Sequence, residues 1–302
     1  FGLRSAFSVL DDFCPKRFRP APMPLANYHS HTYFCDGKYP PGHYAAEARR
    51  QGFLAYGFSS HAPLPFPCRW SMKPDALPRY MAEVQKAKQR YQGELQLYTG
   101  LEIDYIAGVT GPRNPLFQDL NLDYCVGSVH FVGRFANGTG WEIDGPHGLF
   151  LRGLREIHGN DIRRAVEVYY EQIRRMIAEE PPDVVGHLDK IKMQNRHTPL
   201  FDENADWYQA AVLETLQAVA KAGLVLEVNT RGLYKKRAAE TYPGRWALTQ
   251  ALRLGIPVTP SSDAHHPREI SGFFAETTQM LREIGYKTQH VLLDGAWQAV
   301  PA

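Results

Sequence analysis

The sequence predicts an α/β protein in which parallel strands and helices alternate to form one barrel. Short apolar or β-branched runs alternate with longer segments whose apolar residues return every three or four positions. This alternation is typical of a parallel sheet with helices outside it. Six or seven such units follow one another without a change in composition, so one barrel is favoured over two domains. No Gly-x-Gly-x-x-Gly or Walker-type loop follows the first strand, which argues against a dinucleotide or nucleotide-triphosphate fold.

Seven short runs are the expected strands, because they are rich in β-branched and aromatic residues and are bounded by turn residues. In chain order they are residues 25–29, 53–59, 95–103, 122–129, 183–187, 224–229 and 256–261. Five longer segments with helical periodicity lie between them, and several end in glycine. These are residues 42–52, 75–93, 161–180, 205–223 and 244–255.

Two segments fall outside this alternation. Residues 133–160 are rich in Gly, Asn and Trp and are expected to form a long loop over one face of the barrel. Residues 1–22 lead into the Pro-rich stretch "RPAPMP", which resembles a linker. We therefore expect an N-terminal extension over 1–22 and a single domain over 23–302.

Composition favours a small-molecule partner. The net charge is only +2 and the charges are interspersed, so the sequence predicts neither a nucleic-acid nor a membrane partner. No apolar segment approaches the ~18 to 20 residues that a membrane span needs. The cysteines, which do not form a disulfide framework and favour a reduced, cytoplasmic setting, are Cys14, Cys35, Cys68 and Cys125.

Almost every expected strand ends in a side chain that can bind a metal ion. His29 and His31 are two residues apart, so in extended chain both point to one side. Asp263 and His265 repeat this spacing after the last strand. The other strand ends and the loop after the first strand supply Asp36, His61, Glu102, His130 and His187, which makes nine candidate ligands. Asn229, at a further strand end, could orient a ligand or cap a turn.

In a βα barrel the active site is assembled at the carboxyl ends of the strands, so these groups are expected to converge. Imidazoles with carboxylates suit zinc, iron or manganese. Nine candidate ligands exceed what one or two tetrahedral ions need, which predicts two or three divalent ions with Glu102 able to bridge two of them. Metals about 3.5 to 4 Å apart can activate water and hold both oxygens of a phosphoryl displacement. The sequence therefore predicts phosphoester hydrolysis.

Several motifs, in this order, resemble those of the PHP (polymerase and histidinol phosphatase) superfamily, and within it the monofunctional histidinol-phosphatase branch. The resemblance runs from about residue 25 to the end. The motifs are "HSH", "DG", "SSHAPLP", "GLEIDY", "DYCVGSVHF", "GHLDKIK", "LEVNTRGLYKK", "YP" and "SSDAH". The N-terminal extension departs from the family, as does Arg231, where a smaller residue is expected.

The resemblance implies a distorted seven-stranded βα barrel with a trinuclear metal centre. The first metal would take His29, His31, Glu102 and Asp263; the second Glu102, His130 and His187; the third Asp36, His61 and His265. A metal-bridging hydroxide would attack phosphorus and convert L-histidinol phosphate to L-histidinol and phosphate, a step of histidine biosynthesis. An Asp at position 36 matches the histidinol-phosphatase pattern.

Further roles are expected near the strand ends. Asp263 could take a proton in the reaction as well as bind metal. Lys192, Arg231 and Lys235 lead the cationic candidates for binding phosphate, ahead of Lys190. His147, in the expected long loop with Trp141 and Asp144, is a candidate for the substrate pocket.

Three alternatives stay open. The chain could be another PHP phosphoesterase that acts on a nucleotide, another small phosphate ester or a nucleic-acid 3′ end, although no basic stripe favours a polymer. An amidohydrolase-type barrel also opens with His-x-His, but it does not predict Asp36, His61 and His265 together. A non-catalytic metal-binding protein would be expected to have lost ligands, and none is obviously missing.

Overall fold

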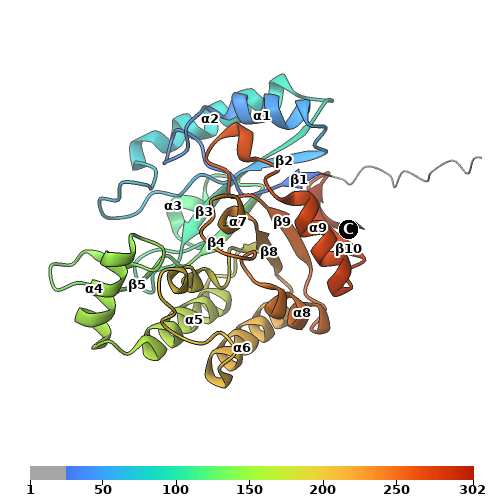
Figure 1. Ribbon diagram of the computed structural model, residues 1–302. Coiled ribbons are helices and arrows are strands. Elements are labelled where there is room, and N and C mark those ends of the chain that lie inside the picture. Colours follow the sequence, from blue (N-terminus) through green and yellow to red (C-terminus); the bar gives the residue numbers. More distant parts are fainter. Residues whose placement is uncertain (1–24) are drawn as a thin grey trace, which may run out of the picture.

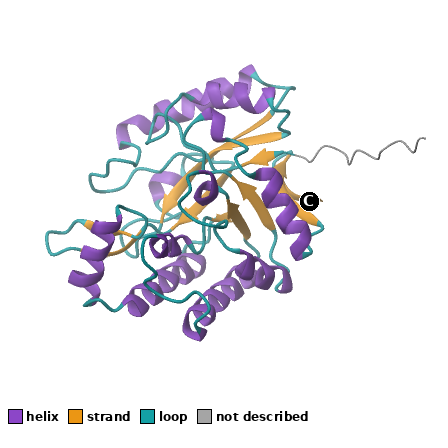
Figure 2. Cartoon of the chain, in the orientation of Figure 1, coloured by secondary structure: helices purple, strands orange, loops and turns teal. Residues whose placement is uncertain are grey.

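The computed structural model describes residues 25–302, so the predicted extension over 1–22 lies outside the described residues. Seven parallel strands form one sheet. The sheet curves into a nearly closed barrel with helices on its outer side, as Figures 1 and 2 show. Their order around the barrel is β1–β2–β3–β4–β7–β8–β9. The bounds are β1 (Ala26–Asn27), β2 (Ala55–Phe58), β3 (Gln96–Asp104), β4 (Tyr124–Ser128), β7 (Val184–Val185), β8 (Val225–Asn229) and β9 (Val258–Ser261). The predicted fold class and all seven expected strands are confirmed.

The first and last strands meet where the barrel closes. Ser30, just after β1, forms a parallel bridge with Ala264, just after β9. The amide of His31 donates a hydrogen bond of 2.8 Å to the carbonyl of Ala264. Because this closure lies beyond the strand ends, it holds the segment that carries His29 and His31 beside the segment that carries Asp263 and His265.

Helices cover the outside of the barrel (Figure 2). The five expected helices are present, and a sixth follows β9. Their bounds are α1 (Pro41–Arg50), α2 (Leu77–Arg90), α5 (Ile162–Glu179), α6 (Asp206–Ala222), α8 (Arg245–Arg253) and α9 (Phe274–Ile284). In α5 the Asp161 side chain caps the amino end by accepting from the Arg164 amide, while Tyr169 and Tyr170 are buried. Short helices α3 (Pro115–Gln118) and α7 (Arg231–Tyr234) lie in loops.

The prediction of a long loop over residues 133–160 is wrong. The strands β5 (Phe131–Arg134) and β6 (Gly140–Glu142) pair as an antiparallel hairpin, and helix α4 (His147–His158) follows. Phe150 and Leu154 of α4 are buried, and Gly153 lies so close to the Trp141 ring that a Cβ would meet it at 2.1 Å. Gly153 therefore reflects close packing, and the apolar spacing within α4 was the better guide.

The amino end of the barrel is closed by a carboxyl-terminal hairpin of β10 (Thr288–Leu293) and β11 (Ala296–Pro301). Leu292 packs there, and its backbone amide and carbonyl both bond the Tyr28 hydroxyl, at 2.8 and 2.9 Å. The apolar cluster at this end, named here the amino-end plug, contains Ala26, Tyr28, Ala55, Tyr98, Tyr124, Val126, Val184, Val225, Val291 and Leu292. The plug leaves the opposite end of the barrel as the place for a site.

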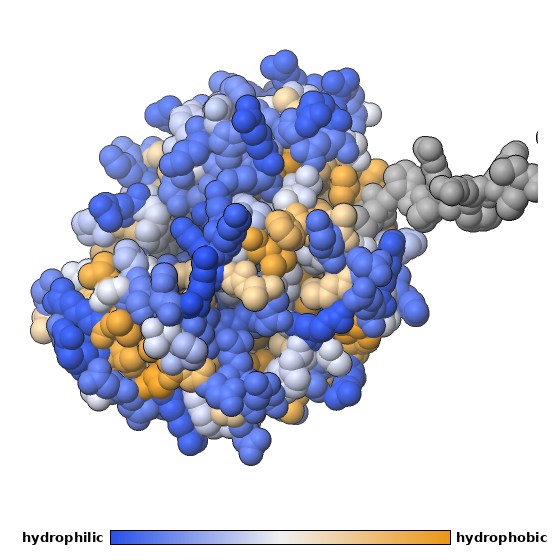
Figure 3. Space-filling view, viewed as in Figure 1, coloured by the Kyte–Doolittle hydropathy of each residue, from blue (hydrophilic) through white to orange (hydrophobic). Residues whose placement is uncertain are grey.

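The surface in view in Figure 3 is mostly hydrophilic, with apolar side chains in separate small groups. Among residues 25–302, no helix combines the length and the apolar character that crossing a membrane requires. Cys35, Cys68 and Cys125 are free thiols, and Cys14 lies outside the described residues.

Candidate metal centre

All nine predicted ligands come together at the carboxyl end of the barrel. They arrive on β3, on the segments that follow β1, β2, β4, β7 and β9, and on the turn that contains Asp36. Asp36 is half-buried and the other eight are buried: His29, His31, His61, Glu102, His130, His187, Asp263 and His265. Residues more than two hundred positions apart in the chain, such as His29 and Asp263, therefore share one cluster.

Glu102 lies at the middle of the group. Its Oε2 atom is 3.2 Å from Nε2 of His29, 3.5 Å from Nε2 of His31 and 2.9 Å from Nδ1 of His61. Its Oε1 atom is 3.0 Å from Nε2 of His187 and 3.7 Å from Nε2 of His130. One carboxylate thus faces five imidazoles, three through one oxygen and two through the other.

Asp263 completes the side of the centre that carries His29 and His31. Its Oδ1 atom is 3.1 Å from Nε2 of His31 and 4.0 Å from Nε2 of His29. Asp263 has a φ of +51°, in the left-handed region that few non-glycine residues adopt. This backbone conformation turns the chain directly after β9.

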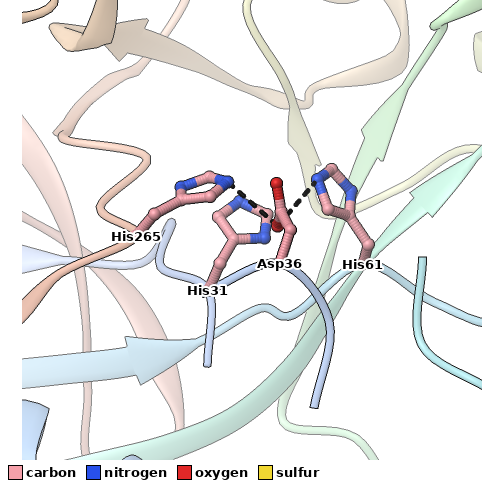
Figure 4. Close-up of side chains that lie close together, drawn as sticks. All are labelled: His31, Asp36, His61 and His265. Atoms are coloured by element: carbon pink, nitrogen blue, oxygen red, sulfur yellow. Dashed lines mark ion pairs between the residues drawn. The ribbon is translucent and has the colours of Figure 1, made fainter. Parts of the chain in front are cut away.

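Asp36, His61, His265 and His31 form a second group, drawn in Figure 4. Oδ1 of Asp36 is 3.1 Å from Nε2 of His265 and 3.9 Å from Nε2 of His61. The turn that brings Asp36 here needs Gly37, because a Cβ at Gly37 would lie 2.2 Å from the carbonyl oxygen of His31. The Asp-Gly pair is a turn and also places a candidate ligand.

His130 and His187 form a third group with Glu102. The Ser128 hydroxyl donates to Oε1 of Glu102 at 2.7 Å, which holds that oxygen between the two imidazoles. His130 is held from behind, because its Nδ1 lies 2.9 Å from Oδ1 of Asp104. Asp104 therefore supports a candidate ligand instead of competing with Glu102 for the ligand role.

The donor set fits divalent metal ions. In each of the three groups the ligand-type atoms lie within 4.8 Å of one another. Several of these atoms are buried without a hydrogen-bond partner, which is costly for a polar atom unless something else binds it. They are Nε2 of His29, Nε2 of His31, Oδ1 of Asp36, Nδ1 of His61 and Oε2 of Glu102. A mixed imidazole–carboxylate set of this kind suits zinc, iron or manganese.

The electrostatics keep the carboxylates ionised. Burial acts to raise the pKa of Glu102, but the imidazoles, His29 foremost, outweigh it and hold this pKa well below its ordinary value. Burial also acts to raise the pKa of Asp263, but nearby charges, the Arg231 guanidinium foremost, outweigh it. This pKa too lies well below its ordinary value. Burial lowers the pKa of His130 while Asp104 raises it, with a net value of about 9.

Two cations flank Asp263. Nζ of Lys190 is 3.9 Å from Oδ2 of Asp263 and 3.1 Å from Oδ2 of Asp144. The Arg231 guanidinium is 3.6 Å from Oδ1 of Asp263 and also contacts Nδ1 of His265. Lys190 is buried beside the centre. From the sequence, the leading candidates for binding phosphate were instead Lys192, Arg231 and Lys235.

The other two predicted phosphate-binding cations are engaged elsewhere. Lys192 is buried between Asp189, at 2.8 Å, and Glu240, at 2.7 Å. Lys235 forms an ion pair with Glu269. Neither lysine forms an ion pair with any of the nine candidate ligands, so their role in binding phosphate stays a prediction.

Glu227 was missed by the sequence analysis. It lies on β8, fully buried, with its Oε1 atom 2.6 Å from Nδ1 of His29. A signal for it was present, because "VLEVN" places one acid inside an otherwise apolar strand, where a charge needs partners.

A cavity of about 290 Å³ lies beside the centre. Asp144 lines it and connects it to the centre through Lys190 and Asp263. His147 also lines it, with its ring centroid 4.6 Å from that of His197 and its Nδ1 3.0 Å from the Gln194 side chain. His147, predicted as a candidate for the substrate pocket, is thus placed on a cavity that adjoins the cluster.

Comparison with known proteins gives consistent matches. The PHP domain family matches residues 27–231. A protein of Deinococcus radiodurans named "Probable histidinol-phosphatase" is 31% identical over 87% of this chain and 95% of its own length. The histidinol-phosphatase of Bacillus subtilis is 32% identical over 80% of this chain and 94% of its own length.

A solved structure shares the fold. Histidinol phosphate phosphatase from Lactococcus lactis, complexed with zinc, L-histidinol and phosphate, superposes with a TM-score of 0.69 at 19% identity. The superposition covers 91% of this chain and 99% of that one. The two proteins therefore share the fold.

Proposed function

The chain belongs to the PHP domain family, and on that premise we propose that it hydrolyses L-histidinol phosphate to L-histidinol and phosphate with divalent metal ions. The observation that carries this proposal is the position of Glu102, which faces five histidines in one buried cluster. Metal ions held by such a cluster would neutralise the charge of a phosphomonoester substrate.

We assign two or three ions to the three groups of side chains. The groups are His29, His31 and Asp263 with Glu102; Glu102, His130 and His187; and Asp36, His61 and His265, with His31 within reach. When bound, such ions activate water and polarise the phosphate. Zinc, iron and manganese all suit these ligands, and supply in the cell selects among them.

The protein's own residues hold the substrate and the proton. Lys190 and Arg231 are proposed to bind phosphate oxygens, because they place positive charge on both sides of Asp263. Asp263 is the proposed proton acceptor, since its carboxylate lies between these cations and the ligand histidine His31.

The cavity lined by Asp144 and His147 is proposed to receive the leaving alcohol. An ester whose phosphate lies near Asp263 can extend past Lys190 into this cavity. L-Histidinol carries an imidazole, which can stack on the ring of His147. The cavity therefore offers a basis for selecting among small phosphate esters.

The test is phosphate release by the purified, metal-analysed protein. We expect L-histidinol phosphate to be turned over at least about tenfold better, in kcat/KM, than a nucleoside monophosphate or a generic phosphomonoester, because a tenfold preference requires only ~1.4 kcal/mol of specific binding in the transition state. Equal turnover of all three esters would leave a PHP phosphoesterase with a different substrate. No turnover of any ester by metal-loaded protein would favour a non-catalytic metal-binding protein.

This function also gives the setting. Its substrate and product are small molecules, and we propose a cytoplasmic enzyme of histidine biosynthesis that needs neither a nucleic acid nor a membrane. The three described cysteines are free, as a reducing compartment requires.

A further inference from the structure

We infer that Glu227 is a positioning residue that sets the orientation and the tautomer of His29 for metal binding. This inference rests on the metal centre proposed above. Glu227 adjoins the centre through its contact with His29 and is not itself among the grouped ligands. It is fully buried, as is His29, so neither side chain can turn to water for a partner.

Four donors converge on the two oxygens of Glu227. Oε1 accepts from Nδ1 of His29, at 2.6 Å, and from the Ser261 hydroxyl. Oε2 accepts from the backbone amide of His187, at 2.6 Å, and from the Asn229 side-chain amide, at 3.2 Å. These donors belong to the segment after β1, the segment after β7, the end of β8 and the end of β9. One carboxylate thus ties together four neighbouring segments that carry or adjoin candidate ligands.

The contact with His29 has a chemical consequence. A carboxylate oxygen can only accept a hydrogen bond, so Nδ1 of His29 must carry a proton. The lone pair that remains for a metal is then on Nε2, the atom that faces Glu102 at 3.2 Å and Asp263 at 4.0 Å. Carboxylates that fix ligand histidines in this way raise metal affinity about 10- to 100-fold.

Glutamine cannot replace Glu227 in this arrangement. The Glu227→Gln side chain has one accepting oxygen and one donating NH₂ group, whereas the site presents two donors to each position. If NH₂ faces His29, Nδ1 must become an acceptor and Nε2 carries the proton, which blocks the metal. If NH₂ faces the other pair, it opposes the His187 amide and the Asn229 amide, and the segment after β7 must shift.

The first test compares metal affinity in the whole protein, with zinc as the probe and a competing chelator. Glu227→Gln is expected to weaken zinc binding about 10- to 100-fold. The matched control is Glu171→Gln, the same chemical change at a side chain of α5 that is 45% exposed and pairs with Arg164. The control is expected to bind zinc as the unchanged protein does. Equal zinc affinity in both variants would overturn the role of Glu227.

The second test needs no variant, so a failure of Glu227→Gln to fold leaves the inference testable. In zinc-loaded protein with ¹⁵N-labelled histidine, the His29 ring is expected to show a protonated Nδ1 and a metal-bound Nε2. A metal-bound or unprotonated Nδ1 would overturn the inference. If the unchanged protein binds no zinc at all, the proposed metal centre itself fails, which is a different result from equal binding in the two variants.

Discussion

At their amino ends the barrel strands present Tyr, Val and Ala to the interior, whereas a few residues further along they present His, Glu and Asp. Tyr28 belongs to the amino-end plug, and the next residue, His29, belongs to the metal centre. Val225 and Glu227 on β8 show the same change two residues apart. The two ends of one barrel therefore have opposite chemistry over a very short distance.

This difference separates stability from function within one fold. The plug buries apolar and aromatic side chains under the β10–β11 hairpin, which is the arrangement that stabilises a folded chain. The metal centre buries ionisable groups that satisfy one another only in part, and several of its atoms have no hydrogen-bond partner. Buried ionisable groups are costly unless they are paired or bind an ion, so this end contributes less to stability than the plug does.

The largest effect is expected from Glu102→Gln at the carboxyl end of the barrel, called here the polar end because the candidate ligands lie there. The change removes the charge that five imidazoles face, and we expect kcat to fall about 10³-fold because ~4 kcal/mol of transition-state stabilisation is lost. Metal content, measured by elemental analysis, should fall with it. Retention of both kcat and metal would show that the polar end does not depend on Glu102.

Leu292→Ala in the amino-end plug is expected to lower the stability of the fold and to leave activity unchanged. Leu292 is 2% exposed, and truncating a buried leucine costs about 3 kcal/mol of the free energy of unfolding. Because Leu292 bonds Tyr28 of the plug and is not among the candidate ligands, kcat and metal content should stay near those of the unchanged protein. Urea titration measures the first quantity, and a large fall in kcat would mean that the two ends are coupled.

Within the polar end, Lys190→Met is expected to lower kcat/KM about 30-fold, since ~2 kcal/mol is typical for a lost charge-assisted contact to substrate. Lys190 is buried and lies 3.9 Å from Asp263. Steady-state kinetics at several substrate concentrations separates KM from kcat. An unchanged kcat/KM would leave Arg231 as the remaining cation beside Asp263.

The smallest effect is expected from Lys235→Met. Lys235 pairs with Glu269 at a partly exposed site, where an ion pair contributes at most about 1 kcal/mol. A change in kcat/KM of less than about threefold is expected. A loss as large as that of Lys190→Met would instead place Lys235 on the phosphate, as the sequence alone predicted.

Much of the site was predictable because it depends on strand ends. The strands are short apolar runs, and His29, Glu102 or Asp263 stands out at their downstream ends without any knowledge of loops. Asp36 was the hardest ligand to place, since an Asp-Gly pair also predicts a simple turn. Its position near His265 depends on a close backbone contact at Gly37 that only the structure reveals.

Other features were harder to predict from the sequence because they depend on contacts with residues far away in the chain. The segment from β5 to α4 was predicted as loop, since its glycines carry no sign that Gly153 packs on Trp141. Lys190 and Lys192 are two residues apart, and only their partners, Asp144 and Glu240, tell which one lies at the centre. Glu227 needed the reverse inference, from a buried charge to the groups that must satisfy it.

The most direct test of the central claim is anomalous diffraction at the zinc edge from a crystal of zinc-loaded protein. Two or three peaks are expected at the carboxyl end of the barrel, one beside Glu102 and His29, each about 2.0 to 2.2 Å from nitrogen and oxygen ligands. Peaks confined to the protein surface, with Glu102 and Asp263 bound to no ion, would contradict the claim.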